Sequence, residues 1–211
     1  MKESADKSRL FLFLIDKEER AMVELDKHII VVRTAGLANE IGFDNINLNV
    51  IADAFGVQTS FLYNYIQGLD DLKKSLMLYG WQQLEAQLLM SVVGLRGYDA
   101  LRAMCYTFYE YATDNLGVFN VMLWYNKFQD EETLEATKHL FSVLFKIMET
   151  LNVPEETINH LIRTFRGFLE GYVLLVNNGA FGNPLSVRES FDFSVEVFLA
   201  GIEKVARNLM S

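Results

Sequence analysis

The chain has 211 residues, of which 51% are apolar and 13% aromatic, so it can bury a sizeable core in one large domain or two small ones. Its formal net charge of −9 argues against a protein that is drawn to nucleic acid by long-range attraction, because neither half of the chain is basic. The single cysteine, Cys105, excludes an intramolecular disulfide framework and fits a reducing compartment.

Helical periodicity dominates the chain and only two prolines interrupt it, so the sequence predicts an all-α protein. Residues 1–21 are expected to be an N-terminal extension. Their apolar run at residues 10–15 is too short to span a membrane and is flanked wrongly for a signal peptide, so we expect an extra helix or arm that packs on the fold. The protein is accordingly expected to be soluble and cytoplasmic, with no membrane partner.

The next elements have the pattern of a helix-turn-helix. A helical pattern over residues 22–41 ends at Gly42, a residue suited to closing a helix. A second, short helix is predicted to begin after Asn47, whose side chain is a good N-cap. Gly56 follows that helix and can adopt the positive φ that a tight turn between crossing helices requires.

Small and apolar residues at set spacings support this helix pair. Ala52 is small where the two helix backbones approach, and Val57 and Leu62 bury the second helix against the first. The stretch resembles the DNA-binding domain of TetR family regulators, which has an Ile-Ala pair, a Gly-Val turn and a Leu-Tyr pair in these places. The corresponding pairs here are Ile51-Ala52, Gly56-Val57 and Leu62-Tyr63.

The resemblance extends over about residues 22–208. In the C-terminal half, residues 165–167 (Phe-Arg-Gly) stand where the TetR subgroup with a WHG-type C-terminal domain has Trp-His-Gly. The sequence is therefore identified as resembling that subgroup, which implies an all-helical TetR-like fold.

The resemblance also implies two functional parts. Residues 22–74 are expected to form the helix-turn-helix DNA-binding domain, and residues 75–211 a helical domain that binds a ligand and dimerises. A homodimer matches the two-fold symmetry of a palindromic operator. We therefore expect a transcriptional repressor, not an enzyme, that needs no cofactor and responds to a small apolar or aromatic effector.

By the same resemblance, a recognition helix over about residues 58–65 lies in the major groove of DNA. The family usually has a histidine where Tyr65 stands and often a phosphate-binding lysine where Leu69 stands, and the leucine cannot replace that lysine. Lysines one turn further on partly compensate for it. The candidate DNA contacts are Gln58, Thr59, Ser60, Tyr63, Asn64, Tyr65, Lys73 and Lys74.

Residues 34–72 contain no lysine or arginine and five acidic residues. Guanine is most often read by arginine or lysine, whereas glutamine and asparagine suit adenine edges. We therefore expect an A·T-leaning operator, low affinity and a shallow salt dependence. The alternative is a helical ligand-binding or protein-interaction dimer that has kept the fold and lost DNA binding.

The C-terminal domain is predicted to be helical throughout. Pro154 and the two acids after it mark one helix start, and Ser186 with Glu189 forms a capping-box pattern at another. The last two helices are long and apolar, and they resemble the pair that forms a four-helix bundle with the partner subunit in TetR dimers. The alternative is that they close the core of the monomer. The predicted helices span residues 76–90, 99–113, 118–128, 133–151, about 155–177, and the stretch after residue 186.

Residues 104–128 hold eight aromatic side chains. Such density suits a ligand cavity with tyrosine hydroxyls and an indole as polar anchors, while the alternative for any one of these residues is ordinary core. The resemblance favours a cavity, because this family binds effectors inside the helical domain. The candidate ligand-binding residues are Tyr106, Tyr109, Phe119, Trp124, Tyr125 and Arg166.

Sequence motifs of hydrolases, nucleotide-binding loops and zinc proteases do not occur. Glu135 with His139, and Glu156 with His160, place possible metal ligands on one helix face, but such pairs arise by chance on solvated helices and no metal site is expected. Cys105 lies among aromatic residues on an apolar helix and is expected to be a core residue.

Overall fold

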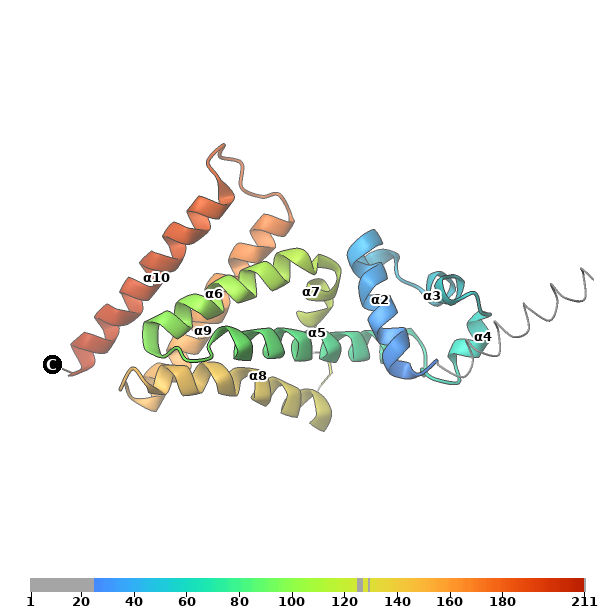
Figure 1. The fold of residues 1–211 in the computed structure, drawn as a ribbon, viewed down its shortest axis with the longest axis horizontal. Helices are drawn as coiled ribbons and strands as arrows, with labels where there is room; N and C mark the ends of the chain where they lie inside the picture. The colour runs from blue at the N-terminus through green and yellow to red at the C-terminus, as the bar shows by residue number, and fades with distance from the viewer. Residues whose placement is uncertain (1–24, 125–126, 129, 211) are drawn as a thin grey trace, which may run out of the picture.

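The computed structural model describes residues 25–124, 127–128 and 130–210, and every regular element within them is a helix. The all-α prediction is confirmed. The molecule is elongated, with the small helices α2, α3 and α4 at one end and α10 at the other (Figure 1). The predicted N-terminal extension, residues 1–21, lies outside the described residues.

The first described helix of the N-terminal group is α2, Lys27–Ile41. Its N-cap is Asp26, whose carboxylate accepts a hydrogen bond of 2.7 Å from the backbone N–H of Ile29. The helix ends at Gly42, which has a φ of 82°, so the predicted helix end is confirmed.

A short 3₁₀ helix, η1 (Phe43–Asn45), leads into α3, Leu48–Phe55. The predicted cap is confirmed, because the Asn47 side chain accepts hydrogen bonds of 3.0 and 3.1 Å from the backbone N–H groups of Asn49 and Val50. These bonds satisfy two of the amides that a helix start leaves unpaired.

Gly56 closes α3 in the left-handed conformation, with φ 66° and ψ 30°, as the turn requires. The following helix, α4, spans only Thr59–Leu62, so the prediction of a recognition helix over residues 58–65 was too long. After Leu62 the chain tightens into turns, because the N–H groups of Asn64 and Tyr65 bond to carbonyls three residues back.

The remaining helices form the larger end of the molecule, and α5 runs through it as the central helix, packed against α2, α6, α7 and α8. No helix among the described residues is long and apolar enough to cross a membrane. These helices are α5 (Leu69–Ser91), α6 (Gly97–Asp114), α7 (Leu116–Met122), α8 (Glu131–Glu149), α9 (Glu155–Asn177) and α10 (Val187–Met210).

Two of these helices differ from the prediction. The start of α5 lies seven residues before position 76, where the carboxylate of Asp71 accepts a 2.9 Å bond from the N–H of Gln67, and α5 therefore crosses the boundary placed at residues 74 and 75. α7 ends at Met122 instead of residue 128, because the N–H of Trp124 bonds to the carbonyl of Val121 in a turn.

The last helix, α10, helps to close the core of the monomer, which is one of the two roles predicted for the last two helices. One face of α10 is buried against α6 and α9, whereas Phe193 and Val197 on another face are 72% and 56% exposed. At the helix start the N–H of Glu189 bonds to the Ser186 hydroxyl at 3.3 Å, as the capping pattern predicted. The buried face consists of Phe191, Val195, Leu199, Ile202 and Ala206.

Candidate functional site

The predicted DNA-reading residues lie at the α4 end of the molecule (Figure 1). Gln58, Ser60 and Asn64 are exposed, and the Tyr63 side chain is 58% exposed. A large aromatic hydroxyl at this exposure is free to meet a base edge or a phosphate. This arrangement leaves a polar, uncharged surface around α4.

Thr59 and Tyr65 are half-buried and support α4 as well as bordering its surface. The Thr59 hydroxyl donates a 2.9 Å hydrogen bond to the side-chain oxygen of Asn49 on α3. The Tyr65 ring meets Phe61 edge to face, with centroids 5.6 Å apart. The Thr59 bond therefore ties α4 to α3, and the Tyr65 ring packs the turn after α4 against α4 itself.

The four lysines and arginines of residues 25–75 are all engaged within the protein. Lys27 bonds to Asp71 at 2.7 Å, and Arg33 lies 4.0 Å from Glu40. Partial burial would raise the pKa of Asp71, but the hydrogen bonds from Lys27 and the Gln67 backbone outweigh it, so this pKa lies below its ordinary value.

Lys73 and Lys74, two of the predicted phosphate contacts, point into the larger end of the molecule. The ammonium of Lys73 lies 5.2 Å from the centre of the Trp124 ring. Lys74 forms ion pairs of 2.9 Å with Asp130 and 2.8 Å with Glu132, and its hydrogen bonds to these carboxylates raise its pKa. As DNA contacts, both lysines stay predictions.

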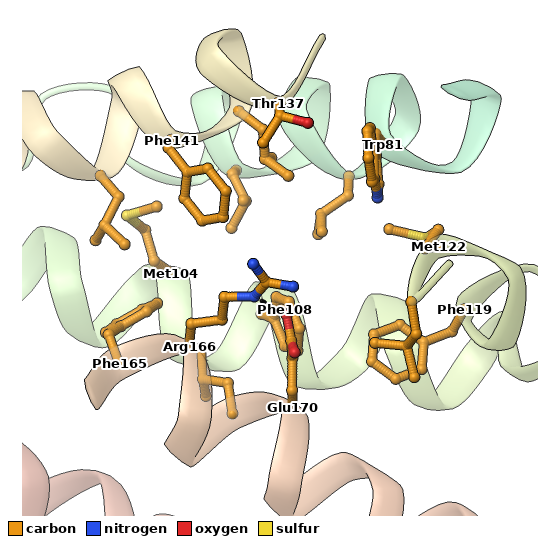
Figure 2. A pocket seen from close by; sticks show the side chains of 16 residues that line it. Trp81, Met104, Phe108, Phe119, Met122, Thr137, Phe141, Phe165, Arg166 and Glu170 are labelled. Carbon is orange, nitrogen blue, oxygen red and sulfur yellow. Dashed lines mark hydrogen bonds and ion pairs between the residues drawn. The ribbon is translucent and has the colours of Figure 1, made fainter. Parts of the chain in front are cut away.

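A cavity of about 70 Å³ lies in the larger end, between α5, α6, α7, α8 and α9 (Figure 2). Its wall is apolar except for Thr137, Arg166 and Glu170. The large side chains that line it are Trp81, Met104, Phe108, Phe119, Met122, Phe141 and Phe165.

Arg166 and Glu170 form an ion pair one turn apart on α9. Figure 2 shows the Arg166 side chain pointing from α9 into the cavity, with Glu170 beside it. The guanidinium carbon lies 5.5 Å from the centre of the Phe141 ring on α8. A charged pair on an otherwise apolar wall is where a ligand would be oriented.

Of the predicted ligand-binding residues, Phe119 and Arg166 line this cavity. Tyr106 and Tyr109 lie elsewhere, in an aromatic cluster around Phe191, which stacks on Tyr109 with centroids 4.2 Å apart. Arg188 lies above both tyrosine rings.

Trp124 is also outside the cavity wall, where it meets Phe43 edge to face and carries Lys73 and Lys127 over its ring. Tyr125 lies outside the described residues. Among the described residues the predicted set is therefore dispersed: Phe119 and Arg166 line the cavity, Tyr106 and Tyr109 share the cluster around Phe191, and Trp124 lies apart from both.

The sequence reasoning overlooked Trp81, Phe108 and Phe141 as cavity residues. Helical spacing gives a signal for one of them, because Met104 and Phe108 are four residues apart and share a face of α6. Tyr106, two residues from each, falls on the opposite face for the same reason.

The cavity is joined to the DNA-reading end by α7. Phe119 and Met122 line the cavity, whereas Gly117 lies against α2. Across this junction the side-chain amide of Asn39 donates to the side-chain oxygen of Asn115 at 3.0 Å, and its own oxygen accepts from the N–H of Val118 at 3.1 Å. One short helix therefore touches both the cavity and the DNA-binding domain.

Other candidate chemistry has a structural role. Cys105 is fully buried, and this burial raises the pKa of its thiol to about 12. Glu135 forms an ion pair of 2.6 Å with Lys138. Within the part of the chain that the structure describes, no three His, Cys, Asp or Glu side chains group in a way that would hold a metal ion.

Comparison with known proteins relates the C-terminal half of the chain to a known family. Residues 101–198 match the family described as tetracyclin repressor-like, C-terminal domain. The uncharacterized HTH-type transcriptional regulator YobS from Bacillus subtilis is 26% identical over 189 residues, which cover 89% of this chain and 98% of that protein. Another HTH-type regulator, Rv0681 from Mycobacterium tuberculosis, is 21% identical and covers 86% of this chain and 83% of its own.

Solved structures share the fold at low identity. TetR from Acinetobacter baumannii AYE has a TM-score of 0.67 and 15% identity, covering 87% of this chain and 99% of that one. The TetR family regulator PfmR from Thermus thermophilus has a TM-score of 0.61 and 17% identity, covering 83% and 96%. The C-terminal half of the chain therefore matches the TetR-type domain, and the chain is similar over most of its length to HTH-type transcriptional regulators and to TetR structures; TetR regulators bind DNA operators and dimerise.

Proposed function

We propose that this regulator is a repressor whose homodimer binds a palindromic operator through α3 and α4 and releases it when a small effector fills the cavity. The observation that carries the proposal is the position of α7, which lines the cavity with Phe119 and Met122 and contacts α2 through Gly117. An effector bound there acts on the DNA-binding domain through one rigid element.

DNA reading falls to polar, uncharged side chains. Gln58 and Asn64 are exposed on either side of α4, and amide side chains pair with the adenine edge in the major groove. Thr59 can contact a thymine methyl group. An A·T-leaning operator bound with modest affinity follows, because no arginine or lysine of α4 is available to read guanine.

The dimer surface is assigned to the exposed faces of α9 and α10. Phe193 and Val197 share one face of α10 with Gly201, and Leu175 on α9 is 46% exposed. A side chain built on Gly167 or Gly201 would meet nothing within 4 Å, so a partner helix can approach closely there. Two helices from each subunit would bury these stripes as a four-helix bundle.

The effector mechanism is a difference in affinity between two states. The cavity volume is about 70 Å³, far below the several hundred Å³ of typical ligand pockets. An effector must therefore enlarge the cavity, and α7 is a wall that also packs against α2. Movement of α7 shifts α2, and the effector favours the dimer whose two recognition helices no longer match the operator spacing.

A second function is favoured by the engagement of Lys27, Arg33, Lys73 and Lys74. With these lysine and arginine side chains already engaged within the protein, the chain would be a helical ligand-binding or protein-interaction dimer without DNA binding. The two functions differ in one observable, which is a specific complex with DNA.

A mobility shift with the DNA upstream of the protein's own gene, at low and then moderate salt, tests the proposal. We expect a specific complex that Gln58→Ala and Tyr63→Ala weaken by about tenfold each, since each removes a contact worth about 1–3 kcal/mol. The matched control is Gln83→Ala, an exposed glutamine on α5. No complex at low salt would favour the second function, and unchanged affinity in both variants would remove these residues from the site.

A further inference from the structure

Phe141 and Arg166 line two hollows at once. They belong to the wall of the inner apolar cavity of about 70 Å³ and to an open groove of about 700 Å³ between α8 and α9. The Arg166 guanidinium lies 5.5 Å from the Phe141 ring centre, so the two side chains stand together as the partition between groove and cavity. Movement of this pair would connect the two spaces.

The outer groove is basic, although the whole chain has a net charge of −9. Its wall holds four cationic side chains and a single carboxylate, that of Glu149. Two of the cations form ion pairs with Glu135 and Glu170, so the other two contribute most to the positive potential of the groove. A cleft of one charge sign concentrates ligands of the opposite sign. The cations are Lys138, Lys146, Arg163 and Arg166.

The size of the inner cavity requires the partition to move. About 70 Å³ is roughly half of the ~150 Å³ cavity that accommodates benzene in an engineered protein. An apolar group that enters from the groove must therefore displace Phe141 and Arg166. Its polar end then remains at the boundary, next to the guanidinium.

The Arg166 guanidinium is paired with the Glu170 carboxylate in the structure. A guanidinium offers a planar fork that matches a carboxylate with two parallel hydrogen bonds. A ligand carboxylate can take the place of Glu170, which lies at a partly exposed position with 26% of its side-chain surface accessible. A neutral ligand offers no such exchange, and a cationic one is repelled by the groove.

We infer that the effector is an amphipathic anion, whose apolar tail fills the inner cavity and whose carboxylate is held by Arg166 at the entrance of the α8–α9 groove. The inference rests on the effector cavity of the proposed function. Glu170 acts as the internal competitor that holds the entrance closed until such an anion binds.

Calorimetric titration of the full chain with three probes that share one tail tests the charge requirement. The probes are phenylbutyrate, phenylbutanol and phenylbutylamine. We expect phenylbutyrate to bind about tenfold more tightly than the alcohol, as a charge-assisted hydrogen bond allows, and the amine to bind most weakly. Equal affinity for acid and alcohol, tightest binding of the amine, or no binding of the acid would overturn the inference.

Variants of the ion pair locate the effect. Arg166→Gln should abolish the preference for the acid over the alcohol, and Arg166→Lys should restore part of it. Glu170→Gln removes the competitor with little change in shape, so it should tighten phenylbutyrate binding by about tenfold and leave phenylbutanol unchanged. Because Glu170→Gln is a gain of affinity, it decides the question even if Arg166→Gln folds poorly.

The matched control is Arg207→Gln, which breaks the ion pair of Arg207 with Glu203, one turn apart on α10 and away from the cavity. It should leave all three affinities unchanged. Acid preference that survives in Arg166→Gln, or that is lost in the control, would overturn the assignment. A preference for the acid in a protein that forms no DNA complex would support the anionic effector and overturn the proposed repressor function. Release of DNA by the acid and the alcohol alike would support the repressor function and overturn the anionic effector.

Discussion

Gly117 of α7 lies against the backbone of Ala38 in α2, so closely that a Cβ built on Gly117 would come within 1.9 Å of the Ala38 carbonyl oxygen. No larger residue fits there without separating the two helices. Since α7 also lines the cavity and α2 belongs to the DNA-binding domain, this contact joins the ligand site to the DNA site. Its neighbours Asn39 and Asn115 add a hydrogen bond of 3.0 Å across the same junction.

We therefore expect Gly117→Ala to separate α2 from α7. The obstacle is backbone, which cannot rotate away, so overpacking should lower the free energy of unfolding by about 1–3 kcal/mol. The variant should also hold the DNA-binding domain in a displaced position and weaken operator binding without any effector. Urea denaturation and the mobility shift measure the two effects.

The control is Gly36→Ala on α2, where a Cβ would meet nothing within 4 Å. This substitution should raise stability by about 0.5–1 kcal/mol, because alanine loses less entropy in a helix. If Gly117→Ala behaves like Gly36→Ala, the α2–α7 contact is not tight in solution and the coupling route is wrong.

The salt dependence of DNA binding should be shallow. All four lysines and arginines of residues 25–75 are engaged within the protein, so few phosphates are neutralised on binding. The slope of log K against log salt should be less than half of the value of about −10 known for a strongly electrostatic repressor. Fluorescence anisotropy over a range of salt concentrations measures it.

Leu69→Lys offers a gain-of-function counterpart. Leu69 is the first residue of α5, where the family resemblance expects a phosphate-binding lysine. The variant should tighten binding and steepen the slope by about 0.9 for each phosphate newly contacted. A steep slope of log K against log salt in the unchanged protein would show that lysines and arginines elsewhere in the chain provide the affinity for DNA.

Phe193→Glu should dissociate the dimer. The Phe193 side chain is 72% exposed in the monomer and lies on the α10 face assigned to the interface, where a carboxylate would be buried without a partner. Sedimentation velocity at micromolar concentration should show a monomer, and operator binding should weaken with it. Met90→Glu is the control, since Met90 is 75% exposed at the end of α5 that lies away from the DNA-binding domain. The Met90→Glu protein should remain a dimer. If the Phe193→Glu protein is also a dimer, the interface lies elsewhere.

Cys105 should resist alkylation at pH 8 in the native protein and react after unfolding. Burial raises the pKa of its thiol from an ordinary value of 9.0 to about 12, so the native thiol stays protonated while the unfolded one begins to ionise. The stability contribution is thus complete below about pH 9 and decreases as the pH rises towards 12. Iodoacetamide labelling followed by mass spectrometry distinguishes the two states, and rapid native labelling would contradict the burial.

Local features of the fold could be predicted from the sequence because they depend on neighbouring residues. The Asn47 cap, the positive φ of Gly56, the start of α9 after Pro154 and the Ser186 cap of α10 are all present. Each follows from a side chain that satisfies backbone groups one turn away, or from the allowed dihedrals of a single residue. The lengths of α4 and α7 were predicted less well, since turns take over where the chain must change direction.

Spacing and composition are properties of the chain itself. They were enough to establish an all-helical protein with a helix-turn-helix, and a stretch without lysine or arginine that contains this motif. Helix packing, in contrast, sets which aromatic residues face one cavity, because helices distant in sequence contribute its wall. Packing also turns Lys73 and Lys74 towards Trp124, Asp130 and Glu132, and it places Arg166 beside Phe141 in one partition. These relations depend on how helices rotate about their axes when they pack, which periodicity within one helix does not specify.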